Sequence, residues 1–429
     1  MNHAERSEIE SITTREKLLH FQEKYLKQLI LHAFENTLYY HRVFEEIGLV
    51  HGGLVDLSKF DKIPILTKDI FRKYYDELVS KDHATRKWYF NSSGGSTGEP
   101  LRFIQDHVYG KWGQAASCNW YETMLGIDEL DARKVVLWGS ERDIAKDGKG
   151  VEATVINWLC SSIFLNSFRM TEEDMKQYIS KINSYKPELI RGYTGSLYEL
   201  CKYAERTNTQ IHSPKALVSC AETLDDQRRE KLESVFGTKV YNFYASRETN
   251  NVAGECKQGL MHILACHNYI EILGADDKPV KEGVEGRVIV TNLHNHSMPF
   301  IRYEIGDMAV LGPQKCSCGS ILPTLEKITG RITAHFVKKD GTVIHGGYFT
   351  RLFYLKDWLH SFQAIQEDYK KVRLVVVLAD DMPDVEKEEI EAKVRVVMGE
   401  DCEIMWDFVD DIPKTVSGKY LYTRSKVWE

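Results

Sequence analysis

The sequence predicts an α/β protein. We expect a large N-terminal domain of βαβ-type sheets with a β-rich subdomain, followed by a small, mobile α+β C-terminal domain. Between residues 134 and 243, short apolar strands alternate with amphipathic helices, which is typical of parallel βαβ units. From about residue 259 short strands are separated by Asp, Gly and Pro turns, which indicates an antiparallel subdomain. A chain of 429 residues also exceeds what one hydrophobic core usually spans.

The individual elements follow from apolar periodicity and from helix-capping residues. Apolar residues recur at helical steps over 13–47, and Thr67 and Thr171 have the position of N-caps that open further helices. The remaining expected helices are 106–125, 196–207, 225–236 and 384–398. The expected strands are 134–139, 188–193, 216–220, 239–243, 269–273, 286–291, 372–378 and 403–408. We place the domain boundary at Gly330-Arg331, which divides the chain into 1–330 and 331–429.

Composition excludes several classes of protein. The formal charge of −7 argues against a nucleic-acid or anionic-membrane partner, and no apolar run approaches the length of a membrane span. The N-terminus is polar, without the apolar stretch of a signal peptide, and the nine cysteines do not form a disulfide-type pattern. We therefore expect a cytoplasmic protein. The sequence does not determine the oligomeric state, although a homodimer is compatible with it.

Residues 92–100 form a run of glycines and hydroxyl residues between two apolar stretches. The glycines allow backbone N–H groups to approach a ligand, and the hydroxyls add hydrogen-bond donors, as polyphosphate binding requires. No Gly-Lys-Ser/Thr follows, so the run is not a Walker A loop. Taken alone it fits a phosphate cradle or a plain loop between two strands. The candidate ligands are Ser93, Gly94, Gly95, Ser96, Thr97 and Gly98.

Four further stretches and a terminal lysine give this loop a context. They are Ala221-Glu222-Thr223, Asn242-Phe243-Tyr244-Ala245-Ser246-Arg247-Glu248, the Arg302 to Asp307 stretch, Gly330-Arg331, and Gly418-Lys419. An aromatic face and an amide edge suit adenine, and a carboxylate suits ribose hydroxyls. A carboxylate that attacks the α-phosphate of ATP needs Mg²⁺ and a lysine to neutralise the developing charge.

In motif and in order these stretches resemble the adenylate-forming superfamily, which activates acyl, aryl and amino acids. The resemblance implies that Ala221, Glu222 and Thr223 line one side of the adenine and that the Asn242 to Ser246 stretch binds its edge and face. It further implies that Glu248 holds magnesium, that Asp307 receives the ribose hydroxyls together with Arg331, and that Lys419 is the catalytic lysine.

Within the superfamily the chain is most similar to the phenylacetate–CoA ligase group and its capsule-biosynthesis relatives. The shared stretches are 35–40, 63–68, 191–197 and 298–303. This likeness implies an acyl-adenylate that passes its acyl group to coenzyme A. An amine acceptor, giving an amide, is the alternative, and a non-catalytic nucleotide-binding protein is a third reading. Departures from the family pattern stand at Glu99, Arg247, Glu304 and Thr333. The aromatic residues Trp138, Tyr193 and Phe243 weakly favour an apolar or aromatic acid.

Cys256, His262, Cys316 and Cys318 supply three thiolates and one imidazole, a set that zinc takes in closed structural sites. Similar stretches occur in the phenylacetate–CoA ligase group, which supports the pairing, and unligated cysteines are the alternative. Cys118, Cys160, Cys201, Cys220 and Cys402 lack such spacing and fit packing roles. His294 and His296 precede the ribose motif and fit either a substrate-facing role or a solvated turn.

Overall fold

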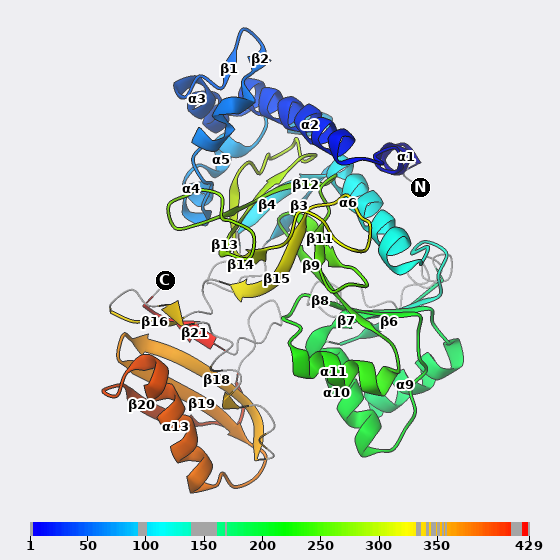
Figure 1. Cartoon of the computed structure of the whole chain (residues 1–429), viewed down its shortest axis with the longest axis vertical. Helices are drawn as coiled ribbons and strands as arrows, with labels where there is room; N and C mark the ends of the chain where they lie inside the picture. The colour runs from blue at the N-terminus through cyan, green and yellow to red at the C-terminus, as the bar shows by residue number, and fades with distance from the viewer. Residues whose placement is uncertain are drawn as a thin grey trace. The chain divides into compact units, whose positions relative to one another are not determined.

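The computed structural model describes residues 3–92, 101–138, 161–167, 170–331, 336–339, 343–344, 349, 352–353, 356, 358–412 and 423–427. The described residues up to Thr329 form one compact unit, and those from Gly330 onward form a second (Figure 1). Within the described part of the chain, no helix has both the length and the apolar content needed to cross a bilayer.

Helices form the N-terminal part of the first unit. The expected pair over 13–47 is confirmed as α2 (Arg15–Asn36) and α3 (Leu38–Glu46), with Thr14 and Thr37 as N-caps whose hydroxyls accept from Lys17 N and Tyr40 N. Thr67 caps α4 as predicted, by accepting from Ile70 N. The other elements of this part are α1 (His3–Glu10), β1 (Val50–His51), β2 (Leu54–Val55), η1 (Leu57–Lys62), α4 (Lys68–Lys73), α5 (Tyr75–Leu78) and η2 (His83–Thr85).

A strand pair flanks the glycine-rich run. β3 (Trp88–Ser92) and β4 (Arg102–Asp106) are antiparallel, with Ser92 opposite Arg102, so the run does connect two strands as expected. Asp106 caps α6 (His107–Trp120) by accepting from Tyr109 N, and α6 continues into a π-helical turn (Tyr121–Leu125). These two segments correspond to the helix predicted over 106–125.

One sheet of eleven strands runs through the first unit, in the order β12-β13-β14-β15-β11-β10-β9-β8-β7-β5-β6. Its parallel half contains β5 (Lys134–Trp138), β6 (Ser162–Asn166), β7 (Leu189–Tyr193), β8 (Ala216–Cys220) and β9 (Val240–Ser246). Helices α9 (Glu172–Tyr185), α10 (Thr194–Arg206) and α11 (Asp226–Phe236) pack beside these strands around a shared apolar core (Figure 1). The predicted βαβ order is therefore confirmed.

The antiparallel half forms the expected β-rich part. Residues beyond 259 were expected to form an antiparallel subdomain attached to the α/β core, and their strands continue the same sheet from β9 onward. Antiparallel pairing joins β9 to β10, β10 to β11, and β11 to β15, because backbone hydrogen bonds run on without a break at the predicted border. This half comprises β10 (Asn250–Glu255), β11 (Met261–Ile263), β12 (Asn268–Leu273), β13 (Glu285–Asn292), β14 (Tyr303–Leu311) and β15 (Thr324–Arg331).

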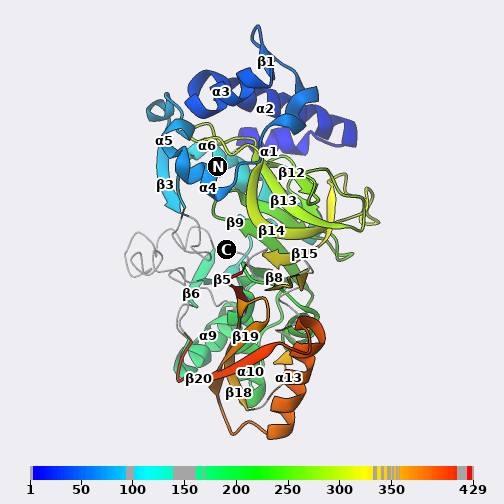
Figure 2. The same cartoon turned by 90° about the vertical axis from the view of Figure 1, so that its left-hand side faces the viewer.

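The second unit is a small α+β fold. Its sheet has the order β20-β19-β18-β21, and α13 (Asp384–Met398) covers one face by burying Ile390, Val394 and Met398 against Val372, Leu374 and Val376 (Figure 2). The predicted helix and the predicted strand at 403–408 match α13 and β20. The other strands are β16 (Phe336–Val337), β17 (Val343–Ile344), β18 (Leu359–Asp368), β19 (Lys371–Leu378), β20 (Glu403–Phe408) and β21 (Thr423–Ser425).

Candidate nucleotide site and cysteine cluster

Two of the predicted nucleotide-binding stretches lie where β8 and β9 end. Ala221, Glu222 and Thr223 follow directly after β8, and the stretch from Asn242 forms the second half of β9. Because β8 and β9 are parallel, both stretches lie toward the same edge of the sheet. Ala221 has a φ of 66°, in the left-handed region, where a residue other than glycine needs support from its surroundings.

Glu222 has a partner within this edge. Its carboxylate accepts a hydrogen bond of 2.6 Å from Gly195 N, and its carbonyl accepts one of 3.2 Å from the Thr194 hydroxyl. Thr194 and Gly195 are the first residues of α10, so the carboxylate binds at the positive end of that helix. Glu222 therefore fixes the turn after β8 to α10, and its place beside adenine remains a prediction.

The side chains of β9 alternate between two faces. Asn242, Tyr244 and Ser246 are partly exposed, whereas Phe243 is 4% exposed and lies 4.8 Å from the Trp120 ring centre. The strand period of two places these three polar residues on one face and Phe243 on the other. Phe243 was predicted as a nucleotide contact, but its side chain belongs to the core, so only its backbone could reach a ligand. Ala245 is exposed.

Tyr244 and Asp307 meet although they come from motifs far apart in the sequence. The Tyr244 hydroxyl donates a hydrogen bond of 2.6 Å to Asp307 Oδ2, and the Asp307 residue is 6% exposed. Tyr244 lies on β9 and Asp307 on β14, which are separated in the sheet order by β10, β11 and β15. The sheet must therefore curve strongly, and this curvature brings the predicted adenine and ribose residues together.

Glu248 lies in the turn after β9, where the backbone is tied down from two directions. Gln105 Nε2 donates to the carbonyls of Arg247 at 2.8 Å and Glu248 at 3.1 Å. The Tyr109 hydroxyl also donates to the Glu248 carbonyl, at 3.3 Å, and the Tyr303 hydroxyl lies 3.5 Å from Glu248 Oε1. Glu248 is 4% exposed, so its carboxylate is held in a nearly closed position.

Gln105 also connects this turn to the strands that flank the glycine-rich run. It lies on β4, and its Oε1 accepts from Asn91 Nδ2 on β3 at 2.9 Å. Sequence reasoning did not identify Gln105, Tyr109 or Tyr303 as functional. A glutamine within an apolar strand is the only signal that the sequence offers for the first of them. The two tyrosines resemble ordinary core residues.

The turn itself is closed by Ser246. Its hydroxyl accepts a hydrogen bond of 3.0 Å from Thr249 N and lies 3.0 Å from Thr249 Oγ1. Arg247 and Glu248 lie between Ser246 and Thr249, so this closed turn fixes the backbone of both residues. A role for Ser246 in binding phosphate, where the family has a hydroxyl at the next position, remains a prediction.

The structure accounts for the unusual residues around Asp307. Arg302, with φ of 48° and 2% exposed, donates to Glu271 through Nε and Nη2 at 3.1 Å each, and to two backbone carbonyls of the 61–63 segment at 2.6 Å. Glu304 accepts from Arg287 Nη1 at 3.1 Å. Both residues therefore stabilise the fold around the site.

Several predicted residues lie outside the described part of the chain. These are Ser93, Gly94, Gly95, Ser96, Thr97, Gly98 and Glu99 of the loop, Thr333, and the catalytic candidate Lys419. Arg331 is the last residue of β15, and only its backbone is described.

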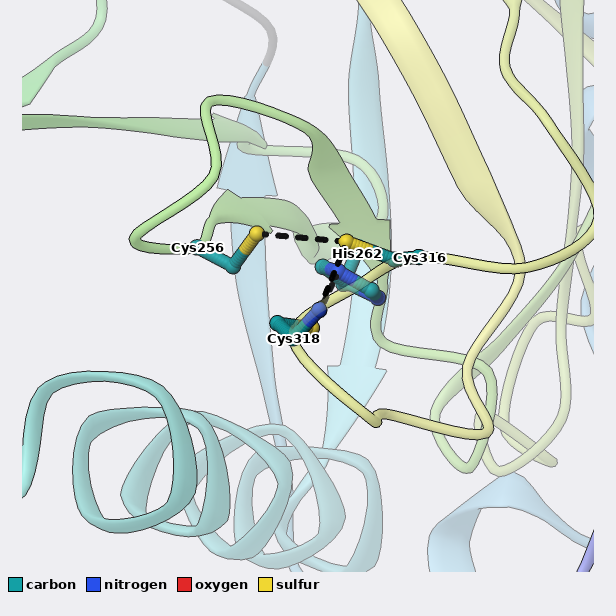
Figure 3. Close-up of side chains that lie close together, drawn as sticks. All are labelled: Cys256, His262, Cys316 and Cys318. Atoms are coloured by element: carbon teal, nitrogen blue, oxygen red, sulfur yellow. Dashed lines mark hydrogen bonds between the residues drawn. The ribbon is translucent and has the colours of Figure 1, made fainter.

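The predicted metal ligands do come together (Figure 3). Cys256 directly follows β10, His262 lies on β11, and Cys316 and Cys318 lie in the segment before β15. Their ligating atoms all lie within 4.8 Å of one another. The two sulfurs of Cys256 and Cys316 are 3.7 Å apart, and Cys318 Sγ is 3.3 Å from His262 Nε2.

These distances fit a tetrahedral metal site. Zinc bonds of about 2.3 Å to sulfur imply a separation of about 3.8 Å between two sulfurs on a tetrahedron. Burial lowers the pKa of His262, which keeps the imidazole in the neutral form that binds metals. Burial raises the pKa of Cys318 to about 11, an effect that a cation at the centre would oppose.

Of the two histidines before the ribose motif, His294 is buried and His296 is partly exposed, and both pack against other aromatic rings rather than in a solvated turn. His294 is 1% exposed, and its ring stacks on Trp112 at 4.2 Å with an angle of 4° between the planes. His296 lies 4.9 Å from the ring of His32 and accepts a backbone hydrogen bond from the Ser80 hydroxyl. Aromatic packing decides both positions, and the short sequence pattern contains no sign of it.

The fold and this arrangement of motifs define a class. A solved structure of a 2-hydroxyisobutyryl-CoA ligase, in the postadenylation state with an acyl-AMP, matches with a TM-score of 0.71 at 18% identity. The match covers 96% of this chain and 89% of the ligase. The chain therefore has the fold of the adenylate-forming enzymes.

Sequence comparisons identify the group within that class. A family model described as the CapK C-terminal domain matches residues 336–426. Protein CapK of Staphylococcus aureus is 24% identical over 98% of this chain and 92% of its own length. A phenylacetate-coenzyme A ligase of Thermus thermophilus is 25% identical over 74% of this chain and 71% of its own. The chain is thus similar to CapK and to phenylacetate-coenzyme A ligases, in agreement with the resemblance that its motifs indicated.

Proposed function

We propose that the protein is an ATP- and magnesium-dependent ligase that activates a carboxylic acid as an acyl-adenylate and then transfers the acyl group to coenzyme A. The observation that carries this proposal is the contact of Tyr244 with Asp307 at 2.6 Å, which brings residues suited to adenine and ribose together although they come from β9 and β14. The buried Glu248, suited to magnesium, contacts Tyr303 of the same strand as Asp307.

In the first half-reaction a carboxylate oxygen of the acid bonds to the α-phosphorus of ATP, and the bond from that phosphorus to the β-phosphate oxygen breaks, so that pyrophosphate leaves. Magnesium would neutralise the negative charge that collects between acid and phosphates. Glu248 would hold that ion, because Gln105 and Tyr109 fix its backbone carbonyl and the Tyr303 hydroxyl contacts its carboxylate. Asp307 would receive the ribose hydroxyls.

Two segments outside the described residues complete the proposed site. The loop from Ser93 to Gly98 would surround the β- and γ-phosphates, and Lys419 would approach the acid and the α-phosphate. The strand that follows this loop supports its part, because β4 contributes Gln105, which binds the Glu248 turn. Arg331, at the end of β15, would contact the ribose and mark the segment about which the C-terminal domain rotates between half-reactions.

In the second half-reaction the thiol sulfur of coenzyme A attacks the acyl carbonyl carbon. The bond from that carbon to the AMP oxygen breaks, the thiol proton is lost, and AMP leaves. The named ligases among the relatives support this acceptor. An amine acceptor, giving an amide, is the alternative, and the match to Protein CapK along nearly the whole chain favours it. A nucleotide-binding protein without turnover is the third candidate.

The cysteine cluster would hold zinc as a structural brace. Four protein ligands complete a tetrahedron and leave no position for a substrate. We place the reaction in the cytoplasm, where ATP and coenzyme A are available, and a homodimer stays compatible with it.

The test is release of pyrophosphate on a panel of aryl, alkyl and amino acids, each with ATP and magnesium, alone and with coenzyme A or with amines. Acid-dependent release that rises with coenzyme A supports the ligase. Release that turns over only with an amine, or with hydroxylamine as a surrogate, supports the amide-forming alternative. Binding of ATP without release of pyrophosphate on any acid would support the third candidate, a nucleotide-binding protein without turnover.

A further inference from the structure

An arginine in the middle of the parallel half of the sheet forms no ion pair with any carboxylate that the structure describes. Arg191 lies on β7, opposite Val136 of β5 and Val218 of β8. Its guanidinium carbon lies 5.7 Å from the centre of the Trp138 ring, and Trp138 in turn lies 4.3 Å from the ring of Tyr193. The positive charge is therefore held among aromatic side chains inside the sheet layer.

The strand register fixes the position of Arg191 relative to the proposed site. Trp138 and Tyr193 lie two residues further along their strands than Val136 and Arg191, so all four side chains lie on one face. Tyr193 is opposite Cys220, and Ala221 begins the predicted nucleotide-binding turn. Arg191 thus lies roughly 7 Å below the edge of the sheet where the nucleotide residues collect, since a strand rises about 3.3 Å per residue.

Two buried polar groups lie together at this position. Arg191 Nε and the Tyr121 hydroxyl form no hydrogen bond of ordinary geometry among the described residues, and the Tyr121 residue is 0% exposed. The two side chains interact with each other, because the charge of Arg191 and a weak hydrogen bond from it oppose part of the rise that burial causes in the pKa of Tyr121. The Nε–H of Arg191 and the hydroxyl proton of Tyr121 are left to donate to a further acceptor.

Glu129, the described carboxylate whose charge acts on Arg191, is already bound elsewhere. Glu129 Oε1 lies 3.2 Å from Lys134 Nζ, and Glu129 Oε2 lies 3.6 Å from Cys118 Sγ. Arg191 forms no ion pair with Glu129 or with any other carboxylate in the described part of the chain. A charge in an aromatic environment without a counter-charge destabilises a fold, and such charges are normally paired.

We infer that the acid activated by this protein carries a second acceptor group, an anionic one such as a carboxylate, which binds Arg191 and the Tyr121 hydroxyl. This inference rests on the proposed function. The aromatic side chains of Trp138 and Tyr193 would flank the body of the acid, and its reacting carboxylate would lie at the edge near Ala221. A dicarboxylic acid, or an aromatic acid with an anionic substituent, has this chemistry. The inference differs from the purely apolar acid that the aromatic residues alone suggest.

The test compares acids that differ only in the second carboxylate: adipate against hexanoate, and terephthalate against benzoate. For each, kcat and KM are measured by pyrophosphate release in the wild-type protein and in Arg191→Met. A hydrogen bond to a charged group contributes enough to predict a preference of about tenfold to a hundredfold for the dicarboxylic acids. Arg191→Met removes the charge at similar volume, so this preference is lost mainly through KM, while the monocarboxylic acids are unaffected or improved.

Two further variants guard against a trivial loss of folding. Arg191→Lys keeps the charge and is expected to keep part of the preference, and Tyr121→Phe removes one donor and is expected to weaken it a few-fold. In thermal unfolding, adipate with ATP should stabilise the wild-type protein but not Arg191→Met. Without ligands, Arg191→Met should unfold at the same or a higher temperature, because an unpaired charge has been removed.

The outcomes separate this inference from the proposed function. A protein that prefers hexanoate and benzoate, and whose preference Arg191→Met does not change, overturns the inference and leaves the ligase intact. Release of pyrophosphate with none of the acids in any variant, together with no stabilisation by adipate and ATP, contradicts both. Equal loss on both classes of acid in Arg191→Met would mean that the arginine only maintains the fold.

Discussion

The two polar centres of the large unit lie on neighbouring strands but are built in opposite ways. In the cysteine cluster, the ligating atoms of four side chains lie within 4.8 Å of one another, a spacing that suits a single metal ion. In the nucleotide centre, Tyr244 holds Asp307 and Tyr303 contacts Glu248, so each acid is positioned by a tyrosine from another strand. The first centre is closed upon itself. The second consists of positioned groups whose chemistry is completed by a ligand.

This difference explains how far each centre could be predicted. The cluster follows from residue types and spacing, because a closed set of metal ligands needs no other part of the chain. Asn242, Tyr244, Glu248 and Asp307 were identifiable only through resemblance to a family. The contacts that position them depend on the curvature of the sheet, which the sequence does not encode locally.

The largest expected effect concerns the nucleotide centre alone. Glu248→Gln keeps the shape of the side chain but removes the charge proposed to hold magnesium, so acid-dependent pyrophosphate release should fall about a thousandfold, or about 4 kcal/mol. Glu304→Gln is the matched control, because Glu304 pairs with Arg287 instead. If both variants lose activity equally, the magnesium role of Glu248 is wrong.

The next effect concerns the cluster alone. Cys316→Ser should lower the zinc content measured by mass spectrometry and reduce the free energy of unfolding by about 3 kcal/mol or more, because loss of a bound metal is among the most destabilising changes. Cys402→Ser, at a buried thiol outside the cluster, is the control. The closed-site interpretation fails if the purified protein contains no metal and tolerates Cys316→Ser.

Acidification provides a third comparison, because the buried His267 packs against Tyr109, whose hydroxyl binds the Glu248 carbonyl. Burial lowers the pKa of His267 from 6.5 to about 3, so the folded protein keeps it neutral while the unfolded chain takes up a proton below pH 6.5. The contribution of neutral, buried His267 to the free energy of unfolding is thus fully present above pH 6.5. It is lost as pH falls toward 3, by about 1.4 kcal/mol per pH unit. Denaturant unfolding between these limits checks the slope.

His267→Asn should flatten this acid slope by one proton, whereas His20→Asn, at an exposed position of α2, should leave it unchanged. The burial of His294 lowers its pKa as well, so part of the slope should persist in the variant. A slope that is identical in the wild-type protein and in His267→Asn would show that His267 does not remain neutral in the folded state.

The smallest effect refines the nucleotide centre. Tyr244→Phe removes the 2.6 Å hydrogen bond to Asp307 and should raise the KM for ATP about tenfold with little change in kcat, because the carboxylate loses its orientation. Tyr89→Phe, on the partly exposed strand β3, should behave as wild type. An unchanged KM in Tyr244→Phe would mean that Asp307 is positioned without the tyrosine.

The fold was more predictable than the site, and for a physical reason. The helix at 384–398 and the strands at 216–220 and 403–408 are set by local periodicity and end where predicted. That the β-rich part continues the sheet of the α/β part could not be predicted, because pairing of β11 with β15 joins segments far apart in the chain. Phe243, His294 and His296 show the same limit, since burial depends on neighbours from distant segments.

The most direct test of the central claim is acid-dependent exchange of radiolabelled pyrophosphate into ATP by the wild-type protein and by Lys419→Ala, with Lys426→Ala as control. Lys426 is a surface residue of the same unit that pairs with Glu367. The expected result is exchange in the wild type and in Lys426→Ala, and its loss in Lys419→Ala while ATP still binds. Undiminished exchange in Lys419→Ala, or none in the wild type with any acid, would contradict the proposal that this chain forms an acyl-adenylate.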